Sequence, residues 1–254
     1  VSVGIDGDPH ITKAVIDQQK CVKCGKCKKI CPHDAIIELD KYKVKKERCI
    51  GCTQCFNKCP KQAIEMVTQL QDYNEGLPKL IENGFDCIEF HAISEAEQDV
   101  DEKWQQINDY FDGMLCISLD RSELGDKKLK ERVKRLIAKR KPFTTIIQAD
   151  GIAMTGGTDD YATTLQSVAT AQLFQNENIP AYIMMSGGTN TKSTELAKQC
   201  KVQPHCLAVG SYARKIVKDY LERDDFYENK EAFNEAVKIA KNLIDTSLRN
   251  MVND

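Results

Sequence analysis

Residues 21–32 read CVKCGKCKKICP, and residues 49–60 read CIGCTQCFNKCP. Each stretch spaces four cysteines as C-x2-C-x2-C-x3-C-P, so the second repeats the first. Three closely spaced thiolates can wrap three corners of an iron–sulfur cubane, and in this spacing the cysteine before proline ligates the other cluster. The pattern therefore predicts two [4Fe–4S] clusters, with Gly25 and Gly51 permitting the tight backbone turn around each of them.

The crossed arrangement assigns a definite ligand set to each cluster. We predict that the first cluster is held by Cys21, Cys24, Cys27 and Cys59, and the second by Cys49, Cys52, Cys55 and Cys31. Zinc is the alternative metal, but zinc sites usually draw four ligands from paired C-x2-C knuckles, which fits a run of four with a trailing proline poorly. Thiolate is also the soft ligand that iron–sulfur clusters require.

The composition of the whole chain supports a reduced metal protein. The chain has 254 residues and 12 cysteines, eight of which fall in the two motifs. No charged-then-apolar leader opens the sequence, and no run of 18 apolar residues could span a membrane. We therefore expect a cytoplasmic protein, and because the sequence begins with Val1 we expect it to be processed or a fragment.

The charge balance argues against a nucleic-acid partner. The net charge is −2, which gives no overall drive toward an anionic polymer or membrane. Residues 121–141 are rich in Lys and Arg but lack aromatic interleaving, so we interpret them as a solvated helix. In the cysteine-rich segment, lysines such as Lys23, Lys26, Lys28 and Lys58 should raise the reduction potential, unless they form only a solvated face.

Beyond residue 69 the sequence alternates short apolar runs with amphipathic segments, which is typical of parallel βαβ units. Including residues 1–5, we predict six strands, at 1–5, 85–91, 113–119, 144–149, 181–185 and 206–210. We predict helices at 122–140, 160–176, 191–200, 212–222 and 229–251.

Two architectures can hold six parallel strands: an open doubly wound sheet, or a (β/α)8 barrel that lacks its first two units. In most strands one face is aliphatic, and the other turns polar toward the carboxyl end. This pattern favours the barrel, whose ligand site lies at the carboxyl ends of its strands. The predicted fold class is α/β: an incomplete TIM-like barrel formed by residues 1–14 and 69–254, with the cysteine-rich domain inserted at 15–68.

The polar ends of these strands suggest a second site. Two segments each follow a predicted strand and precede a predicted helix, as the phosphate-binding loops of barrels do. The first segment contains Ser186, Gly187, Gly188 and Thr189, and the second contains Gly210 and Ser211. The phosphate-bearing cofactor that we expect at these segments is flavin mononucleotide (FMN). The alternative is that the same spacing forms ordinary tight turns between strands and helices. Gln148 and Asp150 would face its non-phosphate part, and Glu89 and His91 are the candidate acid–base pair.

Two resemblances add to these inferences. The cysteine segment, with its parallel continuations CPHDAIIE (31–38) and CPKQAIEM (59–66), resembles the bacterial two-cluster ferredoxin domain. The segments IIQADGIAMTGG (146–157), SGGTNTKSTELA (186–197) and VGSYARKIV (209–217), joined to that domain after SVGIDGDPH (2–10), resemble the light-dependent-period iron–sulfur proteins of cyanobacteria. This second resemblance implies redox sensing that feeds the circadian clock, and further sequence before Val1.

Two functions therefore compete. The first is an electron-transferring, redox-sensing protein that exchanges electrons with a partner protein or a quinone-type carrier. The second is an FMN-dependent oxidoreductase whose clusters supply electrons to a flavin at the barrel mouth. The sequence offers no unambiguous catalytic dyad, which favours the first, and fold alone cannot decide between them.

Overall fold

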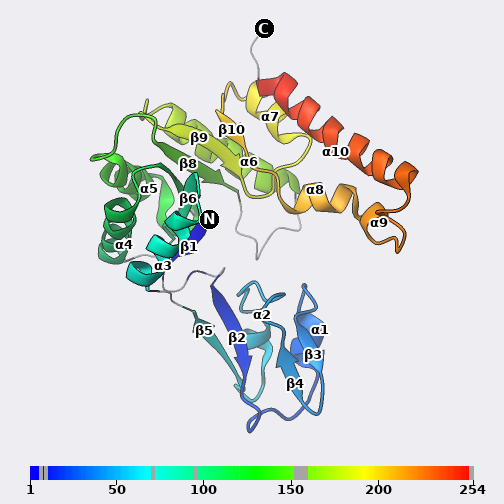
Figure 1. The fold of residues 1–254 in the computed structure, drawn as a ribbon. Coiled ribbons are helices and arrows are strands. Elements are labelled where there is room, and N and C mark those ends of the chain that lie inside the picture. Colours follow the sequence, from blue (N-terminus) through cyan, green and yellow to red (C-terminus); the bar gives the residue numbers. More distant parts are fainter. Residues whose placement is uncertain are drawn as a thin grey trace. The chain divides into compact units, whose positions relative to one another are not determined.

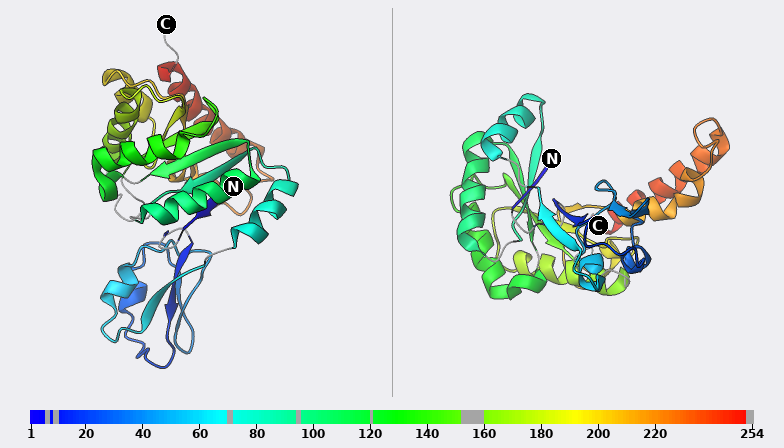
Figure 2. Two further views of the ribbon diagram at one scale, coloured as in Figure 1. Left: turned by 90° about the vertical axis from the view of Figure 1, so that its left-hand side faces the viewer. Right: turned by 90° about the horizontal axis from the view of Figure 1, so that it is seen from below.

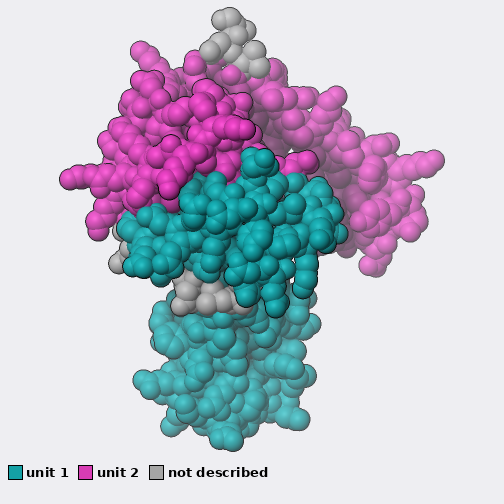
Figure 3. All heavy atoms as spheres, turned by 60° about the vertical axis from the view of Figure 1, so that its left-hand side comes forward, with its two compact units in different colours: residues 1–85, 91–112 teal, residues 86–90, 113–254 magenta. Residues whose placement is uncertain are grey.

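The computed structural model describes residues 1–5, 8, 11–69, 72–93, 96–119, 121–151 and 160–251, with the backbone alone at 122, 123, 160 and 211 (Figure 1). The chain divides into two compact units. The first contains residues 1–85 and 91–112, and the second contains residues 86–90 and 113–254 (Figure 3).

The cysteine-rich segment of the first unit is built from two small antiparallel sheets and two short helices. Strand β2 (Thr12–Ile16) pairs with β5 (Ile64–Thr68), and β3 (Ile36–Glu38) pairs with β4 (Tyr42–Val44). Helices α1 (Lys26–Ile30) and α2 (Gln54–Lys58) pack against each other. The core combines aliphatic side chains with cysteines: Ala14, Ile16, Cys27, Ile36, Tyr42, Cys55 and Ile64.

The sequence repeat is also a repeat of backbone conformation, with an offset of 28 residues from Cys21 to Cys49. Left-handed backbone angles recur at matching positions: Lys23 (φ 54°) with Gly51 (φ 70°), Gly25 (φ 73°) with Thr53 (φ 58°), and Asp34 with Gln62 (both φ 47°). A side chain in this region costs energy, and glycine avoids that cost. Gly25 and Gly51 thus have the left-handed conformation predicted for them. Their repeat partners, Thr53 and Lys23, adopt the same conformation without being glycine.

The first unit also contains strand β1 (Ser2–Gly4) and two helices, α3 (Tyr73–Glu82) and α4 (Glu97–Tyr110). The Asp72 side chain caps α3 by accepting a hydrogen bond from the Asn74 backbone N–H at 2.8 Å. Helix α4 buries Val100, Trp104 and Ile107. Neither helix is among those predicted from the sequence.

A six-stranded sheet has the order β1-β6-β7-β8-β9-β10, which follows the chain throughout. Its later strands are β6 (Cys87–His91), β7 (Met114–Leu119), β8 (Thr145–Asp150), β9 (Tyr182–Ser186) and β10 (Cys206–Leu207). Strands β7, β8, β9 and β10 pair in parallel, with Ile117 opposite Ile147 and Ile147 opposite Ile183. The prediction of an α/β fold with six strands is confirmed, and the last strand is shorter than predicted.

The helices of the second unit are α5 (Arg121–Ile137), α6 (Asp160–Gln175), α7 (Ser193–Gln199), α8 (Ser211–Ile216), α9 (Lys218–Leu221) and α10 (Lys230–Met251). Helices α5 and α6 lie along one side of the strands (Figure 2). The predicted helix at 212–222 is interrupted at Val217. No helix within the described ranges is long and apolar enough to cross a membrane.

The two faces of the strands differ as predicted. The aliphatic face is sealed: Ile88, Phe90, Leu115, Ile117 and Ile147 are each 0 % exposed. Helix α5 buries Leu129, Val133 and Leu136 as its sequence pattern predicts.

Helix α10 differs from α5 in the residues that it buries. They form a stripe of mostly small side chains: Ala232, Ala236, Leu243 and Ser247. Its larger apolar residues Phe233, Val237, Ile244 and Leu248 remain exposed.

Candidate functional site: two cysteine-lined cavities

The cysteines of the first unit line two cavities of similar size. The first cavity is lined by Cys21, Cys24, Cys27 and Cys59, with Tyr42, Ile16 and Ile64 among its apolar walls. The second cavity is lined by Cys49, Cys52, Cys55 and Cys31, with Ala14, Ile36 and Met66 among its walls. Each cavity thus combines three cysteines of one motif with the cysteine before proline from the other motif.

Three of the thiol sulfurs accept backbone hydrogen bonds. The N–H of Ala35 donates to Sγ of Cys31 at 3.3 Å, and the N–H of Ala63 donates to Sγ of Cys59 at 3.2 Å. These two bonds are related by the 28-residue offset. The N–H of Ala14 donates to Sγ of Cys49 at 3.5 Å. Such donors orient thiolate ligands and stabilise their negative charge.

Burial sets the protonation of the innermost thiols. It raises the pKa of Cys27, and it raises the pKa of Cys55 to about 11. These two thiols therefore stay protonated at neutral pH until a metal displaces the proton, since ligation requires the thiolate. No group of three or more His, Cys, Asp or Glu side chains in the described part of the chain is placed to hold a single metal ion.

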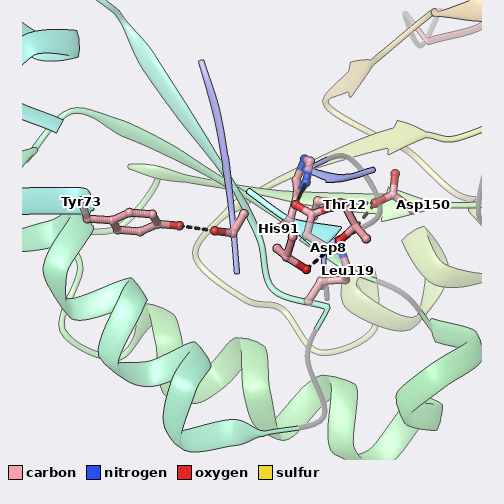
Figure 4. Close-up of polar contacts among 9 residues, drawn as sticks. Asp8, Thr12, Tyr73, His91, Leu119 and Asp150 are labelled. Atoms are coloured by element: carbon pink, nitrogen blue, oxygen red, sulfur yellow. Dashed lines mark hydrogen bonds and ion pairs between the residues drawn. The ribbon is translucent and has the colours of Figure 1, made fainter. Parts of the chain in front are cut away.

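Of the proposed acid–base pair, His91 has a partner that sequence reasoning missed. Its Nδ1 lies 2.7 Å from Oδ2 of Asp8, and both side chains are buried (Figure 4). The Asp8 carboxylate occupies the space beside Gly4, where a Cβ would approach Oδ2 to 1.9 Å. The Tyr73 hydroxyl also donates to the Gly4 carbonyl at 2.8 Å. Glu89 is half-buried on β6, in the other unit.

In the second unit, Gln148 and Asp150 belong to a connected polar network on the face of the strands opposite the aliphatic core. Nε2 of Gln148 donates to Oγ of Ser186 at 3.0 Å, and Oε1 of Gln148 accepts from Sγ of Cys116 at 3.2 Å. Asp150 accepts from the Ser118 hydroxyl at 2.8 Å. Burial raises the pKa of Asp150, although these hydrogen bonds oppose the shift.

The predicted phosphate loop is packed tightly against helix α6. A Cβ on Gly188 would lie 1.9 Å from Cγ2 of Thr163, and a Cβ on Gly187 would lie 2.8 Å from the Gly151 nitrogen. Both glycines have positive φ. The Thr189 hydroxyl donates to the Ala208 carbonyl. These glycines therefore satisfy a packing requirement, and phosphate binding at this loop stays a prediction.

The second segment of that prediction differs from the first. Gly210 precedes α8, which begins at Ser211, and nothing lies within 4 Å of a Cβ built on Gly210. The side chain of Ser211 and the Gly-rich residues 152–159 fall outside the described residues.

Comparisons with known proteins agree with this division of the chain. Residues 14–66 match the family described as 4Fe-4S dicluster domain, and residues 79–246 match the light dependent period A C-terminal domain. A relative from Synechococcus elongatus, named light dependent period A, is 28% identical over 226 residues. That alignment covers 84% of this chain and 54% of the relative, so the chain spans about half of the relative's length.

The cysteine cavities coincide with the 4Fe–4S domain, and the C-terminal match covers most of the remaining chain. The protein is thus an iron–sulfur protein, and it belongs to the light dependent period A family.

Proposed function

We propose that the protein holds two [4Fe–4S] clusters, one in each cysteine-lined cavity, and that it transfers and senses electrons through them. One observation carries this proposal. Cys59 lines the cavity of the first motif, and Cys31 lines the cavity of the second. This exchange is what the two-cluster spacing requires, and a pair of independent zinc knuckles does not require it.

The chemistry of the cavities supports the same conclusion. All eight side chains are soft thiols, and apolar residues such as Ile16, Ile36 and Tyr42 seal the inner walls. Backbone N–H groups point at three sulfurs, an arrangement that tunes cluster potentials. When bound, each cluster would supply a site that gains or loses one electron.

Iron and acid-labile sulfide analysis of anaerobically purified protein tests the proposal. We expect about eight iron and eight sulfide per chain, as two cubanes demand. Stoichiometric zinc without sulfide would contradict it. The absorption spectrum of the same sample tests the flavin alternative, because flavin bands would appear beside the broad cluster absorption.

A signalling role rests on the relative's name, which links that protein to a light-dependent period. We propose that the oxidation state of the clusters is the signal that this chain would pass to a timing system. Replacing Cys24 and Cys52 with serine in the host should then change the response of the period to light. An unchanged response, with the clusters lost, would restrict the protein to electron transfer.

We also propose that the strands of the larger sheet are part of an incomplete (β/α)8 barrel. A doubly wound sheet reverses its strand order near the middle, whereas the order here follows the chain. The sealed aliphatic face and the polar network around Gln148 fit the outer and inner faces of barrel strands. A crystal structure of the longer relative would test whether further strands close the sheet.

A further inference from the structure

The two cysteine-lined cavities are equivalent by the repeat but differ in exposure. Cys24 is exposed, whereas its repeat partner Cys52 is half-buried. Val22, beside Cys24, is 57% exposed, and its repeat partner Ile50 is half-buried. At the rim of the first cavity, one cysteine side chain and one apolar side chain are therefore more exposed than their repeat partners at the second.

The charges around the two rims also differ. Three exposed lysines line the first cavity: Lys23, Lys26 and Lys61. The 28-residue offset relates Lys23 to Gly51, Lys26 to Gln54 and Lys61 to His33, so none of the three lysines has a lysine as its repeat partner. The second cavity contains Arg48, whose guanidinium donates to the Asp34 carbonyl at 3.5 Å.

The lysines at the first rim are only partly neutralised within the protein. Lys23 shares Glu38 with Lys28, at 3.3 and 3.5 Å. Neither Lys26 nor Lys61 forms an ion pair with any residue in the described ranges. Two positive charges at this rim are thus available to an anionic partner.

We propose that Val22, Lys23, Cys24, Lys26 and Lys61, here named the Cys24 patch, form the docking surface for an acidic one-electron carrier protein. This proposal rests on the proposed function, since the patch surrounds a thiol that would ligate the first cluster. A small apolar centre excludes water at the point of closest approach, and the surrounding charges steer and orient the partner. The step moves one electron: the carrier is oxidised by one electron and the cluster is reduced by one, with no proton or group transferred.

The repeat provides a matched control for the test. The Lys26→Gln/Lys61→Gln variant removes two charges at the Cys24 patch. The control, His33→Gln/Arg48→Gln, replaces two basic side chains that line the second cavity. The probe is an acidic flavodoxin, and its affinity for the cluster-loaded protein is measured by isothermal titration at low and at physiological salt. We expect the lysine variant to bind about tenfold more weakly at low salt, and the control variant to bind within twofold of the wild type.

Several outcomes would overturn the docking surface. They are equal losses at both ends, no effect of either variant, no binding by the wild type, and tighter lysine-dependent binding of anionic vesicles than of flavodoxin. Iron and sulfide analysis of each sample separates this result from the proposed function. Samples that lack clusters would count against the clusters themselves, whereas loaded samples with lysine-independent binding would overturn only the Cys24 patch.

Discussion

Nδ1 of His91 lies 2.7 Å from Oδ2 of Asp8, and the residues are separated by most of the first unit's sequence. Asp8 is 1% exposed and His91 is 5% exposed. A buried polar group that loses its partner keeps the full cost of its desolvation. The contact between Asp8 and His91 therefore stabilises the first unit.

Replacing Asp8 with alanine should destabilise the first unit by about 1–3 kcal/mol, the usual cost of an unsatisfied buried group. Fluorescence of Trp104, the chain's single tryptophan, reports urea unfolding of that unit. Asp109→Ala is the matched control, because Asp109 is exposed on α4 and should change stability by less than about 0.5 kcal/mol. Equal effects of the two substitutions would show that the Asp8–His91 contact contributes nothing.

Replacing Cys59 with alanine tests the crossed ligation directly. Because Cys59 lines the first cavity, its loss should damage the cluster held by Cys21, Cys24 and Cys27. Electron paramagnetic resonance of the reduced protein resolves the two centres. Cys31→Ala is the reciprocal variant and should damage the other centre. Loss of only the Cys49–Cys55 centre in the Cys59 variant would contradict the assignment.

Replacing Lys26 with glutamine should lower the reduction potential of the first cluster, because a nearby positive charge stabilises the added electron. The expected shift is a few tens of millivolts, since about 59 mV corresponds to 1.4 kcal/mol for one electron and the lysine is exposed to screening. Gln54→Lys, at the repeat-related position, should raise the potential of the second cluster. Redox titration followed by paramagnetic resonance measures both, and shifts of the opposite sign would exclude control by these charges.

Replacing Gly188 with alanine should destabilise the second unit by about 2–4 kcal/mol, because it combines a left-handed φ of 79° with a clash against Thr163. Gly210→Ala is the control from the same predicted phosphate site. A Cβ added at Gly210 meets no atom within 4 Å, so alanine should cost less there than at Gly188, with only the backbone cost of a ψ of −108°. Thermal unfolding followed by circular dichroism compares them, and a tolerated Gly188→Ala would refute the packing role.

Ligand spacing is a local property of the sequence, so the motifs group the same cysteines that line each cavity, and cluster ligation by them stays a prediction. The strand faces were also predictable, since alternation within one strand separates aliphatic Ile117 from polar Ser118. The partner of His91 was not, because the contact joins residues that no local pattern connects. The close packing of Gly188 against Thr163 could not be predicted from the sequence for the same reason.

Helix α10 shows a different limit of sequence reasoning. Its pattern repeats the apolar residues Phe233, Val237, Ala240, Ile244 and Leu248. The structure leaves the four larger ones exposed and instead buries Ala232, Ala236, Leu243 and Ser247. Small side chains allow a close helix–helix approach to α7, and periodicity alone does not reveal which of two adjacent faces makes that approach. The large stripe is therefore correctly identified as apolar and remains exposed.

The β2–β5 ladder brings the two ends of the cysteine-rich segment together. Thr12 lies opposite Thr68 with their hydroxyl oxygens 3.0 Å apart, and the Gln69 N–H donates to the Ile11 carbonyl at 3.0 Å. Chain ends that already touch in the folded state need little further loop-closure entropy to be joined. We therefore expect a two-residue bridge between Ile11 and Gln69 to span the distance that the whole segment now spans, so that the segment could be removed at this one point.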